Sequence, residues 1–366
     1  VYETLLGEDT AAGGYALAHV SREAEASGWA VQSYYQRAVR DRLGGLRLDR
    51  SIADLDAHWH RDWSRQKLLV GAGYRYSTDD TEPGRDFTLS PASRTTHLVS
   101  GFAQWTGTLQ PELHLMLGSK VTWDTFTEWE PHPSARLWWT PTQTQTAWVA
   151  ISRPVRTPTR VDRDGMFIFG IVDSAGVFVP TGLRGSESVD SEWLLAYEAG
   201  YRIQPRSNLS LDAALYFNDY HDLISIPSVP GTFNNAGEGE SYGVELAATV
   251  RPYDIWDVTA GYAFTEVEHS GPIITFEDRN APKHIAYARS AVDLAKAWEF
   301  DTVVYYVDDI PLSQVPSYTR LDCGLNWRVR SGFEAAVWGH NLLRPGIREL
   351  GADFPRGVWA EGKLRF

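Results

Sequence analysis

The sequence predicts an all-β protein, a transmembrane antiparallel up-and-down β-barrel. Its last ten residues, GVWAEGKLRF, alternate strictly: Val358, Ala360, Gly362, Leu364 and Phe366 form one uncharged face, and the residues between them are mostly polar. Period-two alternation is the pattern of a β-strand with two unlike faces. Similar stretches recur along the chain, and their connections alternate between short and long, as the turns and loops of outer-membrane barrels do. No convincing amphipathic helix interrupts them.

Composition agrees with a barrel and excludes a helical membrane protein. Mean hydropathy is −0.32, and no stretch approaches the ~20 apolar residues that a spanning helix needs. A barrel tolerates this low value because only alternate residues face lipid. The 15 Trp and 17 Tyr among 366 residues suit the aromatic girdles of such a barrel, although Trp-rich soluble propellers also exist.

Charge, cysteine count and the amino end bear on the partners, the disulfides and the targeting signal of the chain. The net charge of −13, with no basic cluster, excludes nucleic acid as a partner. Cys323 is the only cysteine, so no internal disulfide is expected. The first residues, VYETLLGEDT, carry no signal peptide. We therefore expect either a mature chain or one that lacks its front.

Seventeen strands are predicted in order, and the segments between them, including 77–93 and 153–190, are predicted loops. The clearest is 318–329, where Leu321, Cys323 and Leu325 share one face and charged residues share the other. The predicted strands are 15–20, 29–40, 51–62, 67–76, 97–108, 113–128, 135–139, 146–152, 193–203, 209–220, 242–250, 256–265, 285–294, 298–307, 318–329, 333–338 and 357–366.

The odd number of predicted strands has a topological consequence. If the last strand ends at the periplasm, the first begins outside the cell, whereas a bacterial single-chain barrel has an even count. We therefore expect the carboxy-terminal part of a larger barrel, truncated at its amino end.

A series of short motifs resembles the TonB-dependent outer-membrane receptors. AISRPVRTP at 150–158 is similar to the strand end "sxaxRtP" of that family, and EAGYR at 198–202 is similar to "E-x-G-(Y/F)-(R/K)". The order and spacing of the motifs match the family across nearly the whole chain. The other matching motifs are GFAQ at 101–104, LGSK at 117–120, PSARL at 133–137, FNDYHDLI at 217–224, NAG at 235–237 with YGVEL at 242–246, GHNLL at 339–343, and PR at 355–356.

This resemblance implies a 22-strand barrel in the bacterial outer membrane, plugged by an amino-terminal domain. It implies active uptake of a scarce ligand, usually a ferric siderophore, powered by the TonB complex touching the plug. Residues 1–366 read as a partial barrel domain of about seventeen strands without the plug, so coupling to TonB is carried over to no residue here. A truncated barrel also has two unpaired edges, which lipid does not tolerate, so we expect no transport by this part alone.

Four residues of one predicted strand are candidate metal ligands: Asp54, Asp56, His58 and His60. Alternate residues project to the same side, and carboxylate and imidazole groups bind metals. They spread over ~20 Å, too far for one ion to hold all four. The alternative interpretation is the water-facing side of a barrel strand.

The loop at 153–190 supplies candidate ligand contacts. Arg153, Arg156 and Arg160 lie at the outer end of a strand and would attract an anionic ferric chelate. The alternative is that they pair with nearby acidic residues. Phe167 and Phe169 belong to an apolar stretch that either folds over the lumen and contacts the ligand or packs on its own hydrophobic residues.

The sequence therefore predicts an outer-membrane receptor for active transport, with lipid, a small-molecule ligand and TonB as partners. No catalytic motif is present, so no enzyme activity and no cofactor are expected. A passive porin and a soluble β-propeller are the alternatives. The ligand stays open among siderophore, haem, cobalamin and oligosaccharide.

Overall fold

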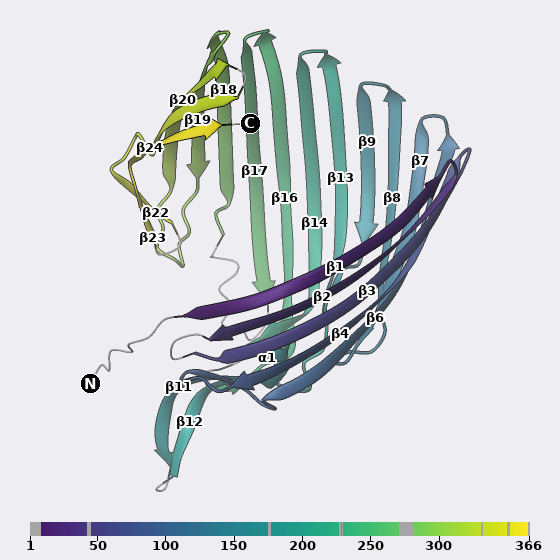
Figure 1. Ribbon diagram of the computed structural model, residues 1–366, viewed down its shortest axis with the longest axis vertical. Coiled ribbons are helices and arrows are strands. Elements are labelled where there is room, and N and C mark those ends of the chain that lie inside the picture. The colour runs from purple at the N-terminus through teal and green to yellow at the C-terminus, as the bar shows by residue number, and fades with distance from the viewer. Residues whose placement is uncertain are drawn as a thin grey trace.

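The structure is a computed structural model that describes residues 9–41, 45–174, 177–226, 228, 230–270, 281–330, 332–349 and 352–364. One antiparallel sheet dominates it (Figure 1). The sheet has eighteen strands, of which β10 (Val155–Arg156) is only two residues long. The remaining seventeen pair in the order of the chain, from β1 to β24. They are β1 (Thr10–Ala24), β2 (Ser27–Asp41), β3 (Arg47–Trp63), β4 (Gln66–Glu82), β6 (Ser93–Gln110), β7 (Leu113–Asp124), β8 (Glu130–Thr142), β9 (Gln145–Ser152), β13 (Glu192–Arg206), β14 (Leu209–Ser225), β16 (Asn234–Tyr253), β17 (Trp256–Ser270), β18 (His284–Ala295), β19 (Trp298–Val307), β20 (Tyr318–Arg330), β21 (Phe333–His340) and β24 (Gly357–Leu364).

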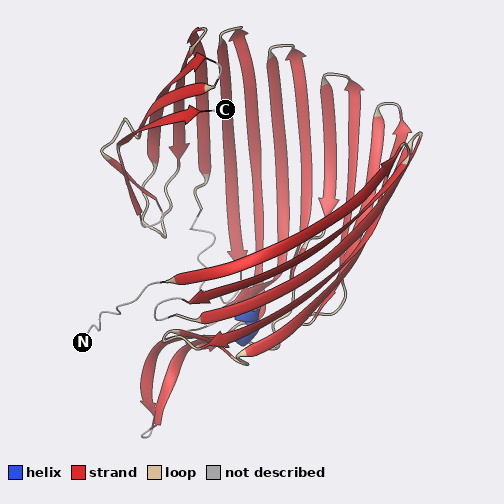
Figure 2. Ribbon diagram, in the orientation of Figure 1, coloured by secondary structure: helices blue, strands red, loops and turns tan. Residues whose placement is uncertain are grey.

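The up-and-down order places all short turns on one side and all long connections on the other (Figures 1 and 2). The short turns join β1 to β2, β3 to β4, β6 to β7, β8 to β9, β13 to β14, β16 to β17, β18 to β19 and β20 to β21. In outer-membrane barrels the long connections are extracellular. The prediction of an all-β up-and-down sheet with about seventeen strands is confirmed.

The two faces of the sheet differ as the alternation predicts. Large apolar side chains are exposed on the convex face, for example Val149 at 53%, Leu215 at 58% and Leu246 at 46%. Exposing so much apolar surface to water is unfavourable, and a contiguous apolar surface of this kind marks contact with lipid. The concave face, called the lumenal face below, carries the polar members of each alternating strand.

Aromatic residues bracket the apolar band of the convex face. On β17 they are Trp256 and Phe264, and on β19 they are Trp298 and Tyr306. Each pair is eight residues apart, which is roughly 27 Å along a strand, and strand tilt reduces the height to about 20 Å. That height is close to the apolar band of outer-membrane barrels, which is flanked by aromatic girdles.

Two segments predicted as loops contain regular structure. Strand β4 continues to Glu82, so the predicted loop at 77–93 was placed too early. Its residues up to Asp80 pair regularly with β6, with Ser77 and Asp79 on the lumenal face, and their polarity was mistaken for a loop signal. The segment 153–190 holds β10, α1 (Arg160–Asp164), β11 (Gly165–Ser174) and β12 (Val177–Arg184).

A small second sheet lies on the side of the long connections. Its order is β15-β12-β11-β5, with β5 (Phe87–Leu89) and β15 (Gly231–Thr232) contributed by two other connections. Leu183, Val189 and Phe233 form its buried apolar cluster. A third sheet, the hairpin of β22 (Gly346–Glu349) with β23 (Ala352–Pro355), lies between β21 and β24 in the chain. Within the described residues, no helix is long and apolar enough to cross a membrane.

Glycines let large rings lie flat on the lumenal wall. A Cβ atom built at Gly200 would lie 2.4 Å from the indole of Trp148, and one built at Gly243 would lie 2.5 Å from the hydroxyl of Tyr216. Such distances leave no room for any other residue. The rings therefore cover the neighbouring strand and do not fill the lumen.

A charge placed on the convex face should destabilise the protein, and the same charge one residue further along should not. Leu246 faces lipid and Ala247 faces the lumen, opposite Asp212. We expect Leu246→Arg to lower the free energy of unfolding by roughly 2 kcal/mol and Ala247→Arg by less than about 1 kcal/mol. Urea unfolding in phospholipid vesicles measures both. Equal losses in the two variants would contradict the assignment of the faces.

Candidate functional site in the lumen

The connection between β9 and β13, residues 153–191, is called the strap. Local sequence starts its helix: the Thr159 hydroxyl accepts the Asp162 amide, and the Asp162 carboxylate accepts the Thr159 amide at 2.7 Å. This reciprocal capping box fixes the first turn of α1. The helix thereby presents Arg160 and Asp164 on one side, four residues apart.

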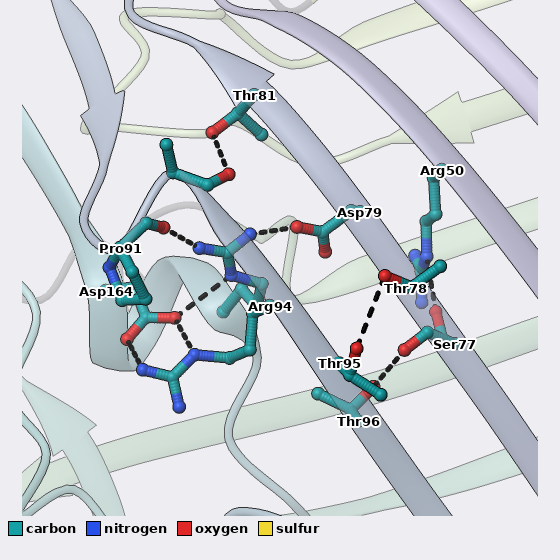
Figure 3. A network of polar contacts seen from close by, with 12 residues as sticks. Arg50, Ser77, Thr78, Asp79, Thr81, Pro91, Arg94, Thr95, Thr96 and Asp164 are labelled. Atoms are coloured by element: carbon teal, nitrogen blue, oxygen red, sulfur yellow. Dashed lines mark hydrogen bonds and ion pairs between the residues drawn. The ribbon is translucent and has the colours of Figure 1, made fainter.

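Arg160 and Asp164 attach the strap to the lumenal wall of β4 and β6. Figure 3 shows Asp164 next to Arg94, with Asp79 of β4 nearby. Arg160 forms ion pairs with Asp79 of β4 and with Asp164, the latter at 3.0 Å. Arg94 of β6 donates to Asp164 at 2.8 Å. The side chains of Arg160 and Asp164 are only 10% and 2% exposed. Buried charges need such partners, because removing one leaves another uncompensated.

The other end of the strap stays with β13. Val155 and Arg156 pair with Trp193 and Glu192 as strand β10. The strap therefore runs from the β9–β13 wall to the β4–β6 wall, and α1 lies between the two in Figure 1. Arg163 strengthens the crossing by donating to the carbonyl oxygens of Phe126 and Val189 at 2.8 and 2.9 Å.

The three arginines predicted as ligand contacts lie apart, each with partners in the protein. Arg153 donates to the carbonyl of Pro131 at 2.9 Å and stacks on Trp193, 4.8 Å from the ring centre. Arg156 forms an ion pair with Glu192 at 2.9 Å. Arg160 is buried in the anchor to β4. Their role in ligand binding stays a prediction.

The two predicted phenylalanines face different surroundings. Phe167 packs against the cluster of Leu183 and Phe233 and lies 4.7 Å from the Phe87 ring. Phe169 is 63% exposed. A ligand contact by either ring stays a prediction.

The four candidate metal ligands lie in a row on the lumenal face of β3. Asp54 accepts the Arg75 guanidinium at 2.7 Å, and His60 lies 3.5 Å from the Glu23 carboxylate. Across the described part of the chain, no group of three or more histidine, cysteine or acidic side chains is arranged to hold a metal ion.

A cavity of about 1160 Å³ lies between the strap and the outer half of β13, β14, β16 and β17. Arg156 and Asp162 contribute to it from the strap, and Phe233 from the next connection. From the sheet, its lumenal lining includes Trp148, Glu192, Glu198, Tyr216, Asn218, Tyr220, Ser241, Glu245, Thr265 and His269. Aromatic walls with a few convergent polar groups are typical of a small-molecule site.

Sequence reasoning placed most of these lining residues in strands, left Glu192, Ser241 and His269 outside the predicted strands, and identified none of them as a site. Glu198 belongs to the EAGYR motif and Glu245 to the YGVEL motif, so both were singled out for family resemblance alone. The missing information was the register, which sets Glu198 opposite Tyr216 and Ala214 opposite Glu245. The alternation of each strand already showed which residues share the lumenal face.

The chain matches a known protein family over most of its length. The family described as TonB dependent receptor-like, beta-barrel, matches residues 5–342. The chain belongs to this family. Its membership places the chain in the bacterial outer membrane, as predicted.

Solved structures with similar folds are receptors of this kind. The siderophore receptor PirA from Pseudomonas aeruginosa shares 12% identity at a TM-score of 0.75, covering 97% of this chain and 63% of the other. The ferric-catecholate import receptor Fiu from Escherichia coli K12 shares 11% identity at 0.75, covering 98% and 64%. The chain thus spans less than two thirds of these proteins. No curated protein sequence matches it.

Replacing Arg160, which pairs with both Asp79 and Asp164, should release the strap from β4. Arg160→Ala leaves Asp79 and Asp164 without their shared cation, and breaking a buried pair costs roughly 3 kcal/mol. We expect proteolytic cleavage within 153–191 to accelerate by at least roughly tenfold, because cleavage follows the population of the open form.

Arg251→Ala is the matched control, since Arg251 forms an exposed ion pair with Asp257 near a short turn. Exposed pairs contribute little, so strap cleavage should stay at the wild-type rate. A strap that remains equally resistant in Arg160→Ala would show that the ion pairs do not hold it.

Proposed function

We propose that the chain forms the wall and outer mouth of an outer-membrane receptor that takes up a scarce small molecule by TonB-dependent active transport. The observation that carries the proposal is the aromatic and polar cavity held between the strap and the sheet, in a barrel of the TonB-dependent receptor family. The ligand proposed is a ferric siderophore. The structurally similar proteins PirA and Fiu, a siderophore receptor and a ferric-catecholate import receptor, support this class.

In this mechanism the ligand enters from outside and binds under the strap, and movement of a plug domain outside residues 1–366 then admits it. A passive porin is the alternative. The strap argues against it, because buried ion pairs fix a segment across the lumen. Receptors of this family transport ligands and perform no catalysis, in line with the prediction that the chain is not an enzyme.

Uptake in whole cells tests this function. We expect cells that express the complete gene to accumulate radiolabelled ferric siderophore against its gradient. Accumulation should fall to the level of a deletion strain when TonB is absent or the proton gradient is collapsed. The assay uses several cationic and anionic iron chelates, so that its result does not depend on the choice of a single ligand. Uptake that persists without TonB would favour the passive porin. If cells that express the gene accumulated no more ligand than the deletion strain, both the receptor and the porin would be contradicted.

A further inference from the structure

We propose that the pair Tyr74–His97 on the lipid-facing surface binds a phosphate group of the outer-leaflet glycolipid, lipopolysaccharide. A second pair of the same design, Tyr262–His284, forms a weaker site of the same kind. Both pairs lie on the convex face, away from the lumen, and the strands on either side of each pair belong to this chain. The inference therefore depends neither on the transported ligand nor on what fills the lumen.

The two pairs share one geometry. The Tyr74 hydroxyl lies 2.8 Å from Nδ1 of His97. The Tyr262 hydroxyl lies 2.9 Å from Nδ1 of His284. In both pairs the ring centres are 6.1 Å apart and the rings are inclined by 24°. One pair joins β4 to β6 and the other joins β17 to β18 (Figure 1), so the same arrangement occurs at two separate places on the surface.

Strand register produces this geometry. Tyr76 lies directly opposite His97, with 5.5 Å between the ring centres. Phe264 lies directly opposite His284, with 5.2 Å between the ring centres. In each case the tyrosine that contacts Nδ1 lies two residues further into the membrane, at the diagonal position of the same face. Two aromatic rings thus fix the orientation of each imidazole.

Both histidines lie at the outer edge of the apolar band. On β6, His97 and Trp105 face lipid and are eight residues apart. Trp256 and Phe264 bracket the apolar band of β17 with the same spacing. His284 lies opposite Phe264, the outer residue of that pair, and begins β18 after a long connection. Aromatic girdles mark the height at which the headgroups begin, so both imidazoles lie beside the headgroups of the outer leaflet.

Each imidazole has one nitrogen left for a ligand. Nδ1 contacts the tyrosine hydroxyl, and Nε2 has no hydrogen bond or ion pair to any residue that the structure describes. With the hydroxyl donating to Nδ1, the neutral ring carries its hydrogen on Nε2, and a protonated ring carries one there as well. Nε2 then donates to a phosphate oxygen, in a hydrogen bond that the charge of the phosphate strengthens. Lipopolysaccharide presents such phosphates on the sugars that carry its acyl chains.

His97 lies in uncharged surroundings. Its backbone N–H donates to the Thr125 hydroxyl at 2.7 Å, and Thr95 is the next residue outward on the same face of β6. Tyr74 and Tyr76 lie across from it on β4. None of these four side chains carries a charge at neutral pH. A phosphate at Nε2 of His97 is therefore not repelled by any of them.

His284 has acidic neighbours. Asp308 donates its backbone N–H to the His284 carbonyl oxygen at 2.9 Å and so extends the pairing of β18 with β19 by one residue. Glu266 follows Phe264 on the same face of β17, and Lys283 forms an ion pair with Glu266. Carboxylates repel a phosphate, and a single lysine offsets only part of that repulsion. We therefore expect weaker binding at His284 than at His97.

The test measures how much lipid A, the phosphorylated lipid part of lipopolysaccharide, stays bound to the complete receptor in phosphatidylcholine nanodiscs. Native mass spectrometry counts the bound molecules, and bisphosphorylated lipid A is compared with lipid A from which both phosphates have been removed. We expect the wild type to retain the bisphosphorylated form preferentially. His97→Phe, which keeps a ring in the girdle, should retain roughly tenfold less of it, because a hydrogen bond to a charged group is lost. His284→Phe should lose roughly threefold.

His114→Phe is the matched control. Nδ1 of His114 also lies near a hydroxyl, 3.1 Å from that of Thr108, and the ring stacks on Trp138 with 5.1 Å between centres. These residues face the lumen, where Trp138 lies opposite Trp148, so retention should equal that of the wild type.

Equal amounts of each variant in the outer membrane exclude a folding defect. The inference is overturned if the wild type retains both forms of lipid A equally, or if retention does not fall in His97→Phe. It is also overturned if retention falls as far in His114→Phe, or further in His284→Phe, than in His97→Phe.

Discussion

The backbone hydrogen-bond ladder is the constraint on which the rest of the structure depends. Lipid offers no partner for an N–H or C=O group, so a strand that crosses it must pair along its length with neighbouring strands. The ladder accordingly runs from β1 to β24 with each strand beside its sequence neighbour. Once pairing is fixed, the pleat sends alternate side chains to opposite faces, and slipping by one residue would exchange lipid and lumenal residues. Alternation along every strand is therefore a requirement of the membrane.

Side chains are free to vary for function only where they do not face the lipid hydrocarbon. The convex face must be apolar, but the lumenal face and the long connections are free to vary. The strap uses that freedom: a capping box orients α1, and Arg160 and Asp164 then attach it to Asp79 and Arg94 on the opposite wall. The cavity lies between the strap and the sheet, and this attachment fixes α1, whose Asp162 lines it. Its position thus depends on buried ion pairs, whereas its lining depends on strand register.

Period two made the strands and their faces predictable from sequence, because it repeats within each strand. Cys323 and Leu325 were assigned to the apolar face without any knowledge of their neighbours. The site was less accessible, since it joins residues of five strands and two connections. Arg160 was noted as a cation of an outer loop, but its partner Asp79 is 81 positions away in the sequence. Asp79 itself was placed in a loop, since a polar strand end resembles a loop when only composition is considered.

Thiol accessibility along β20 tests the two-faced barrel most directly. Single cysteines are placed at 321, 323, 325, 320, 322 and 326, each in a background without any other cysteine, and exposed to a water-soluble maleimide in intact outer membranes. The account predicts slow labelling at the odd positions, including the native Cys323, and faster labelling at the even positions. Uniform labelling, or the opposite alternation, would contradict a convex face in lipid and a polar face toward a wet lumen.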